Sequence, residues 1–382
     1  MTSDERFMRL ALRLAAKAKG QTRPNPMVGA VVVARGRIVG KGVHRRAGQP
    51  HAEVMALRQA GPKTKGATLY VSLEPCHHFG RTPPCTQAIV RAGIGRVVAA
   101  MIDPNPKNRG RGVRFLRSHG IQTRVGVLEK QAQILNEVFV TWMKTKRPFV
   151  TVKVAQSLDG KIATRTGESR WISGPAARRW VHRLRSQVDA ILVGVGTVLK
   201  DDPRLTVRIG PLRRAVHPEH GSKDERLAQG ERTIRVILDS ELRTPPKARI
   251  FSSGSPVLIA TSAAVPRSRE EKLRRAGAEV LRLPSRKGRV DVKALLKALA
   301  RREVLHLLIE GGGEVIASAF EAHVVDRIAF IVTAKIIGGR KAPTAVDGEG
   351  IASLAHAIPL KNIRIQPLGS DLLVTADVYR HR

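Results

Sequence analysis

Three side chains of the types that bind transition metals lie close together in the first quarter of the chain. His51 begins the sequence His-Ala-Glu, while Cys76 and Cys85 each follow a proline. These are the two cysteines that the chain contains. One neutral imidazole and two thiolates make a three-ligand zinc site whose fourth tetrahedral position is open to water. The residue types and their grouping therefore predict a catalytic zinc site with His51, Cys76 and Cys85 as ligands.

Glu53 stands two residues after the predicted histidine ligand and suits the role of proton carrier. Zinc lowers the pKa of a bound water from about 15.7 to about 7, and a carboxyl group beside that water can accept and return its proton. H-x-E followed by P-C-x-x-C, with a glutamate that does not bind the metal, is typical of zinc deaminases. Here eight residues separate Cys76 from Cys85 instead of two, so the pattern departs from the general one.

Two other interpretations of the same residues stay open at this point. Cys76 and Cys85 could form a disulfide, although nothing in the sequence indicates an oxidising compartment. A closed structural zinc site could use His77 or His78 as its fourth ligand. That arrangement would leave Glu53 without a role.

The elements around these residues indicate how they are positioned. The apolar run 30–33 predicts a buried strand, and a turn at 35–37 leads into a further extended segment. We expect a helix over 53–60, which stops before Gly61 and Pro62. A strand over 68–73 then delivers Cys76 at its carboxyl end, and a helix follows Cys85. Strand ends and helix starts are where open α/β sheets usually place their sites.

The length of 382 residues predicts two domains, since a single core commonly serves about 100 to 200 residues. A short basic stretch closed by Pro148 gives the best boundary, with a first domain over 1–147 and a second over 148–382. In the second domain a strand begins at Phe149. Apolar runs at 190–196, 233–238, 256–260 and 305–309 then alternate with helical patterns, which indicates an α/β fold.

A glycine-rich turn follows the last of these apolar runs. Gly311, Gly312 and Gly313 stand between the run and an apolar helical stretch over 315–320. Glycines at such a turn let backbone N–H groups approach a phosphate at the start of a helix. The signal is weak by itself, because the full G-x-G-x-x-G pattern is missing.

Both halves resemble one family. The segments 24–26, 50–53 and 73–85 are similar to the pyrimidine deaminase domain of the bifunctional RibD proteins of riboflavin biosynthesis. Lys153 and the segments 157–163, 167–173, 196–208 and 309–312 resemble the reductase domain of that family, whereas 213–230 is a polar insertion that matches poorly. The resemblance implies a cytidine-deaminase-like three-layer α/β/α domain followed by a dihydrofolate-reductase-like α/β domain.

The resemblance also implies two reactions. Zn²⁺ would serve the hydrolytic deamination of 2,5-diamino-6-ribosylamino-4(3H)-pyrimidinone 5′-phosphate. NADPH would then reduce the ribose of 5-amino-6-ribosylaminouracil 5′-phosphate to a ribityl chain. The implied substrate-binding residues are Lys153, Ser169, Arg185, Leu205, Arg208 and Glu310. The implied NADPH-binding residues are Ala155, Trp171, Thr197, Asp201, Ser240, Gly312, Gly313 and Glu314. Trp171 could instead be a core aromatic residue, and Asp201 could cap a turn.

The net charge of +37 invites a nucleic-acid interpretation, since so basic a protein is attracted to phosphate backbones. The charge is spread over both domains, however. Residues 1–147 hold 27 Lys and Arg against 7 Asp and Glu, and the remainder holds 41 against 24. Aromatic residues make up 3% of the chain, too few for the stacking surfaces that bind single strands. We expect small phosphorylated pyrimidines as partners and no specific nucleic acid.

The start of the chain has helical periodicity, with Thr2 and Glu5 in the pattern of a capping box. No stretch reaches the roughly 18 apolar residues that a membrane span requires, so we expect a cytoplasmic enzyme without membrane contact. A homo-oligomer stays open. Two other functions also stay open. One is a zinc deaminase of nucleosides or tRNA bases fused to a different reductase, and the other is a nucleic-acid-binding protein with a structural zinc.

Overall fold

The computed structural model describes residues 1–80, 82–207, 233–252 and 254–379. The chain divides into two compact units, Met1–Lys146 and Arg147–Arg382, which we call the first and the second unit. The predicted substrate residue Arg208 and the insertion 213–230 lie outside the described residues. None of the described helices combines the length and the apolar character needed to cross a membrane.

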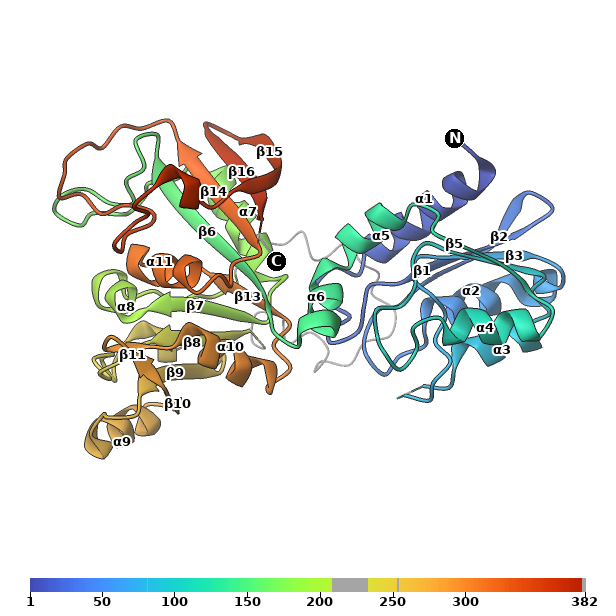
Figure 1. Ribbon diagram of the computed structural model, residues 1–382, viewed down its shortest axis with the longest axis horizontal. Helices are drawn as coiled ribbons and strands as arrows, with labels where there is room; N and C mark the ends of the chain where they lie inside the picture. Colours follow the sequence, from blue (N-terminus) through green and yellow to red (C-terminus); the bar gives the residue numbers. More distant parts are fainter. Residues whose placement is uncertain (81, 208–232, 253, 380–382) are drawn as a thin grey trace. The chain divides into compact units, whose positions relative to one another are not determined.

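The first unit is a five-stranded sheet with helices on both faces (Figure 1). The strands, in the spatial order β2-β1-β3-β4-β5, are β2 (Arg37–Val43), β1 (Gly29–Ala34), β3 (Thr68–Val71), β4 (Arg96–Ala99) and β5 (Gln122–Val125). β1 is antiparallel to both of its neighbours, and β3, β4 and β5 are parallel. Helices α1 (Ser3–Ala16) and α5 (Glu129–Leu135) lie on one face, with α2 (Ala52–Ala60), α3 (Cys85–Arg91) and α4 (Arg111–Ser118) on the other. Helix α6 (Glu137–Thr145) closes the unit. The predicted three-layer fold is confirmed.

Helix α1 is fixed at its start by a capping box and by a buried carboxylate. The Glu5 backbone N–H donates to Thr2 Oγ1 at 3.3 Å, and the Thr2 N–H donates to Glu5 Oε2 at 3.1 Å, which confirms the predicted cap. Asp4 accepts hydrogen bonds from Tyr70 Oη at 2.8 Å and from Arg96 at 2.7 and 2.9 Å. These contacts tie the helix to β3 and β4.

Helix α2, which carries Glu53, lies directly on the backbone of β2. A Cβ atom added to Gly42 would lie 1.9 Å from the carbonyl oxygen of Ala52, and one added to Gly40 would lie 2.1 Å from that of Ala56. Since such distances leave no room for any side chain, only glycine fits at either position. The two glycines therefore set the depth at which the start of α2 lies over the sheet.

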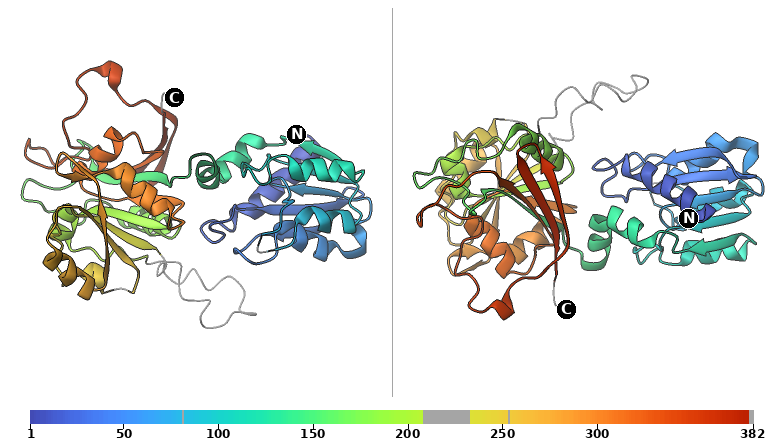
Figure 2. Two further views of the ribbon diagram at one scale, coloured as in Figure 1. Left: turned by 60° about the horizontal axis from the view of Figure 1, so that its bottom comes forward. Right: turned by 90° about the horizontal axis from the view of Figure 1, so that it is seen from above.

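The second unit is a nine-stranded, mostly parallel sheet. The spatial order is β10-β9-β8-β7-β13-β6-β14-β16-β15, with β16 antiparallel to both of its neighbours. The strands are β6 (Phe149–Ser157), β7 (Ala190–Gly194), β8 (Ile234–Leu238), β9 (Val257–Ser262), β10 (Ala278–Leu283), β13 (His306–Ile309), β14 (Arg327–Thr333), β15 (Leu360–Leu368) and β16 (Asp371–Val378). Two short strands, β11 (Ser285–Arg286) and β12 (Arg289–Val290), pair with each other in a separate two-stranded sheet. The last strands form one edge of the large sheet, orange to red in Figure 2.

Three apolar clusters bury the faces of this sheet. Helices α10 (Val292–Ala300) and α11 (Gly313–Glu321) pack over one face. On the other face lie α7 (Pro175–Arg185), α8 (Val195–Asp201) and α9 (Arg267–Arg275). The predicted α/β fold is confirmed, although two predicted strands end early. β3 stops at Val71, and β7 stops at Gly194 because the chain turns there into α8.

Candidate active sites

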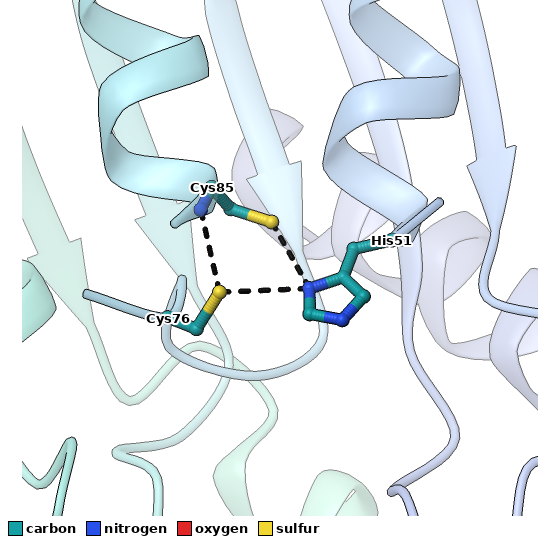
Figure 3. A group of neighbouring side chains, drawn as sticks. All are labelled: His51, Cys76 and Cys85. Atoms are coloured by element: carbon teal, nitrogen blue, oxygen red, sulfur yellow. Dashed lines mark hydrogen bonds between the residues drawn. The ribbon is translucent and has the colours of Figure 1, made fainter. Parts of the chain in front are cut away.

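The first unit brings the three predicted metal ligands together from three separate segments. His51 immediately precedes α2, Cys76 lies in the loop between β3 and α3, and Cys85 is the first residue of α3. Figure 3 shows the three side chains pointing toward one another. His51 Nδ1 lies 3.2 Å from Cys85 Sγ and 3.5 Å from Cys76 Sγ. Both cysteines are free thiols, so the disulfide interpretation finds no support.

The geometry of this group fits a zinc ion. With Zn–N of about 2.0–2.1 Å and Zn–S of about 2.3 Å, a tetrahedral ion separates its nitrogen and sulfur ligands by about 3.6 Å. The ligand atoms of His51, Cys76 and Cys85 all lie within 4.8 Å of one another. Among the described residues, no other histidine, cysteine or carboxylate is close enough to serve as a fourth ligand. His77 contacts Thr86 Oγ1 instead, at 3.2 Å, so a closed four-ligand site finds no support either.

Glu53 lies in the first turn of α2 and is 3% exposed. Burial, reinforced by the negative charge of Cys76, raises the pKa of its carboxyl group to about 7. A group with such a pKa can either accept or donate a proton near neutral pH. The carboxyl group lies beside the metal-binding sulfurs, yet it is not part of the three-ligand group.

The pKa values of the two thiols are shifted in opposite directions. A hydrogen bond from Cys85 lowers the pKa of Cys76 to about 4, with a further contribution from His51, while the same contact and burial raise the pKa of Cys85. The pKa of Cys85 is raised although Cys85 is the first residue of α3, where the helix dipole favours a thiolate. Because metal binding requires both thiolates, it must release a proton from this pair.

The loop before α4 holds the backbone on either side of Cys76. Asn108, which is fully buried, accepts the His77 N–H at 2.8 Å and donates to the Pro75 carbonyl at 3.3 Å. Glu74 accepts the backbone N–H groups of Asp103, Gly110 and Val113 at 2.9–3.1 Å. Cys76 is thus fixed by side chains that do not themselves bind metal.

The second unit contains a cavity of about 580 Å³ at the carboxyl ends of its central strands. Ten of the predicted site residues line it. They are Lys153, Ala155, Ser169, Thr197, Asp201, Ser240, Glu310, Gly312, Gly313 and Glu314. Trp171 and Leu205 do not belong to the lining. Trp171 is 64% exposed with the Arg178 guanidinium 4.6 Å over its ring, and Leu205 is buried in the apolar core.

Arg185 is also absent from the cavity lining, and most of its donors are already engaged. Its Nε and NH2 groups donate to the two oxygens of Glu310 at 2.6 and 2.7 Å, and NH1 donates to the Thr206 carbonyl at 3.1 Å. Burial would raise the pKa of Glu310, but the charges of Arg185 and Lys153 lower it overall. Burial lowers the pKa of Lys153 itself. Glu310 therefore lies between two cations at the wall of the cavity.

The remaining wall of the cavity suits a dinucleotide. No side chain caps α11, which starts at the turn formed by Gly311 and Gly312, and the φ of Gly312 is +77°. A Cβ atom on Gly313 would lie 2.1 Å from Asp347 Oδ2. The Asp347 side chain therefore fills the space beside Gly313. The turn at Gly312, in contrast, lets a phosphate approach backbone N–H groups and fits the diphosphate of a nicotinamide cofactor.

Comparisons with known proteins match each of the two units to a protein family. The family model described as "RibD C-terminal domain" matches residues 148–374, and the "Cytidine and deoxycytidylate deaminase zinc-binding region" matches residues 1–101. The riboflavin biosynthesis protein RibD of Aquifex aeolicus is 46% identical over 372 residues, which cover 97% of each chain. That of Escherichia coli is 40% identical over 97% of this chain and 98% of its own.

The chain belongs to the RibD family. Among solved structures, Acinetobacter baumannii RibD is similar with a TM-score of 0.86 and 34% identity, covering 99% of both chains. A Thermotoga maritima protein called a diaminohydroxyphosphoribosylaminopyrimidine deaminase/5-amino-6-(5-phosphoribosylamino)uracil reductase has a TM-score of 0.82 and 36% identity, also over 99% of both. Membership of the RibD family makes the chain a bifunctional deaminase and reductase of riboflavin biosynthesis.

Several residues that support these RibD-type sites could not be recognised from the sequence. Asn108 stands between Lys107 and Arg109, so that its neighbours suggest only a basic exposed loop. Lys200, Arg243 and Arg289 line the cavity of the second unit but are hidden among the 68 Lys and Arg residues of the chain. The one usable signal was the turn-rich sequence from Asp103 to Pro106, which places a tight loop next to the site.

Proposed function

We propose that the first unit removes the amino group from C2 of 2,5-diamino-6-ribosylamino-4(3H)-pyrimidinone 5′-phosphate, with Glu53 as the catalytic proton carrier. The observation that carries this proposal is the position of Glu53. It is buried beside the group formed by His51, Cys76 and Cys85, and its pKa is raised to about 7. These three residues would hold the zinc ion that the deaminase region of the family binds.

Zinc, when bound, supplies a water whose pKa is lowered to about 7. Glu53 accepts a proton from the attacking water and donates it to the ring nitrogen next to C2. It then delivers the second proton to the departing amino group, which leaves as ammonia, and a carbonyl group remains at C2. Burial raises the pKa of the Glu53 carboxyl group, so the group can hold a proton between the two transfers.

The second unit would then use NADPH to reduce the ribose of 5-amino-6-ribosylaminouracil 5′-phosphate at C1′, which yields a ribityl chain. Support comes from the cavity, which offers the glycine turn at α11 for a diphosphate and Lys200 and Arg243 as cations, while a third cation, Arg289, is paired with Glu314 at 2.6 Å. Cations along a cofactor cavity favour the extra phosphate of NADPH over NADH. In this proposal Ala155, Thr197, Asp201, Ser240, Gly312, Gly313 and Glu314 contact the cofactor.

Lys153, Ser169 and Glu310 are proposed to face the substrate from the other side of the cavity. The Ser169 hydroxyl donates to Asp201 Oδ1 at 2.9 Å, which links the substrate side to the cofactor side. Arg185 would act on the substrate through Glu310, whose carboxylate it fixes. Roles for Trp171, Leu205 and Arg208 rest on the family resemblance and stay predictions.

The proposal is tested by measuring the two activities of Glu53→Gln separately. Proton transfer by a positioned group contributes roughly 10²–10⁴-fold, and since Glu53 serves in several transfers, we expect deamination to fall by at least about 10⁴-fold. NADPH-dependent reduction of the aminouracil phosphate should persist, because the second unit has its own core and cavity. Zinc content, measured on the same samples, should be unchanged.

Glu129→Gln is the matched control, since Glu129 stands in the first turn of α5 in the same unit and is exposed. It should retain both activities. An equal loss of deamination and reduction in Glu53→Gln would contradict the assignment of one reaction to each unit. Retained deamination in that variant would contradict the role of Glu53.

A further inference from the structure

The imidazole of His51 is held at both of its nitrogen atoms. Nδ1 faces the sulfurs of Cys85 and Cys76 at 3.2 and 3.5 Å, and Nε2 lies 3.2 Å from the hydroxyl oxygen of Thr82. A neutral imidazole carries one proton, so that one nitrogen donates a hydrogen bond while the other keeps a free lone pair. Which nitrogen can bind a metal therefore depends on what the other nitrogen contacts.

We propose that Thr82 is a positioning residue that accepts the Nε2–H of His51 and thereby leaves Nδ1 free for the metal. The inference rests on the proposed zinc site of the deaminase unit. Within the described residues, Thr82 is the hydrogen-bond partner of Nε2. The nearby ring of His44 lies edge-on at 5.1 Å, and its own nitrogens contact Asn25 Nδ2 and the Pro50 carbonyl oxygen.

This role gives a reason for the long segment between the two cysteines. Thr82 stands three residues before Cys85 and is joined to it by Pro83 and Pro84, whose fixed φ angles stiffen the connection. α3 then begins at Cys85. The hydroxyl that orients one ligand and the sulfur of another are therefore carried by one rigid stretch. A spacing of two residues between the cysteines leaves no room for such a side chain.

The test compares Thr82→Val, which keeps the shape but removes the hydroxyl, with Thr82→Ser, which keeps the hydroxyl. Zinc affinity of the full-length protein is measured by competition with a chromophoric chelator. Loss of a partner that orients a metal ligand typically costs about 10–100-fold in metal affinity, and we expect that loss for Thr82→Val. Thr82→Ser should stay within about threefold of the parent. In the cobalt-substituted protein, the ligand-field bands should shift in Thr82→Val only.

Thr86→Val is the matched control. It removes a second threonine–histidine contact in the same region, the 3.2 Å contact with His77 Nδ1, which involves none of the three ligands. Its zinc affinity should stay within about threefold of the parent. NADPH-dependent reduction should be unchanged in all three variants, since Thr82 and Thr86 belong to the first unit.

Two results would overturn the proposal. One is a zinc affinity and a cobalt spectrum in Thr82→Val that equal those of the parent. The other is an equal loss in Thr82→Ser and Thr82→Val. Because Thr82→Ser keeps the hydroxyl, that result would show that the hydroxyl does not orient His51 and that the loss comes from disturbed packing of the loop. Failure of the proposed function is distinguishable from either, because it would show as zinc binding by the parent protein without any deamination of the pyrimidine phosphate.

Discussion

Replacement of Arg185 by methionine should destabilise the second unit more than it weakens the binding of phosphorylated substrate. Arg185 and Glu310 form a bidentate ion pair, with nitrogen–oxygen distances of 2.6 and 2.7 Å. Their side chains are 15% and 4% exposed. Removal of one partner of a buried pair leaves an uncompensated charge and costs about 3–5 kcal/mol. Because Lys153 also stabilises the charge of Glu310, we expect the lower end, about 3 kcal/mol.

A double-mutant cycle isolates the pair. Glu310→Gln alone should cost a similar amount, since it leaves the guanidinium unpaired, whereas the double variant should lose about 2 kcal/mol less than the sum of the two. Unfolding of the full chain in denaturant is followed by hydrogen exchange and mass spectrometry. Peptides from β7 and β13 report the second unit, and peptides from β3 and β4, in the first unit, serve as the internal reference.

The pH dependence of this loss has a definite sign. Against the effect of burial, Arg185 holds the pKa of Glu310 below its ordinary value of 4.5, so the pair stabilises the fold above about pH 4.5 and loses its contribution as the pH falls further. In Arg185→Met the pKa of Glu310 should rise. The difference in unfolding free energy between parent and variant should therefore shrink on acidification.

The opposite pattern would refute this reasoning. If Arg185→Met unfolds within about 0.5 kcal/mol of the parent while the KM for the phosphorylated substrate rises, Arg185 binds phosphate directly. The family resemblance implies that role, and the ion pair with Glu310 would then be a feature of the ligand-free protein alone.

Three further predictions concern other parts of the chain. Hydrogen bonds from Arg96 lower the pKa of Asp4 from 3.8 to about 2, so Asp4→Asn should cost the first unit about 2 kcal/mol at pH 7 and flatten its acid unfolding curve between about pH 4 and pH 2. Asn108→Ala leaves the buried Pro75 carbonyl and the partly buried His77 N–H unpaired and should lower stability by about 2–4 kcal/mol, measured by urea unfolding. The substitution Arg109→Ala at the neighbouring exposed position should change stability by under about 0.5 kcal/mol. Arg243→Ala should raise the KM for NADPH roughly tenfold in steady-state kinetics and leave that for NADH unchanged, since a charge-assisted hydrogen bond contributes about 1.5–3 kcal/mol. Equal effects on the KM values for NADPH and NADH would show that Arg243 does not bind the extra phosphate of NADPH.

The metal-site group was predictable because its signal is local. His51 and Glu53 stand two residues apart, and each cysteine follows a proline, so residue type and spacing sufficed to indicate the chemistry. The structure brings the three ligand atoms within 4.8 Å of one another. The strands and helices around the ligands were predictable for a similar reason, since the apolar run marks β1 and the glycine and proline after α2 mark the end of that helix.

The supporting contacts were not predictable, because they join residues far apart in the chain. Arg185 meets a carboxylate 125 positions away, and Asn108 meets the backbone at Pro75, 33 positions away. The family resemblance implied substrate binding for Arg185, and the basic neighbours of Asn108 suggested only an exposed loop. Only the packed fold decides which buried charge or backbone group such a side chain contacts.

The close approach of the α2 backbone to β2 at Gly40 and Gly42 limits how this site can change. Gly40 and Gly42 bring the helix backbone against the strand, so the start of α2, with Glu53, cannot be moved by exchanging one apolar residue for another. Laboratory selection for a new deaminase substrate should therefore leave positions 40 and 42 as glycine in every active clone. Substitutions that alter the substrate range should instead collect in the loops that end at Cys76 and Cys85.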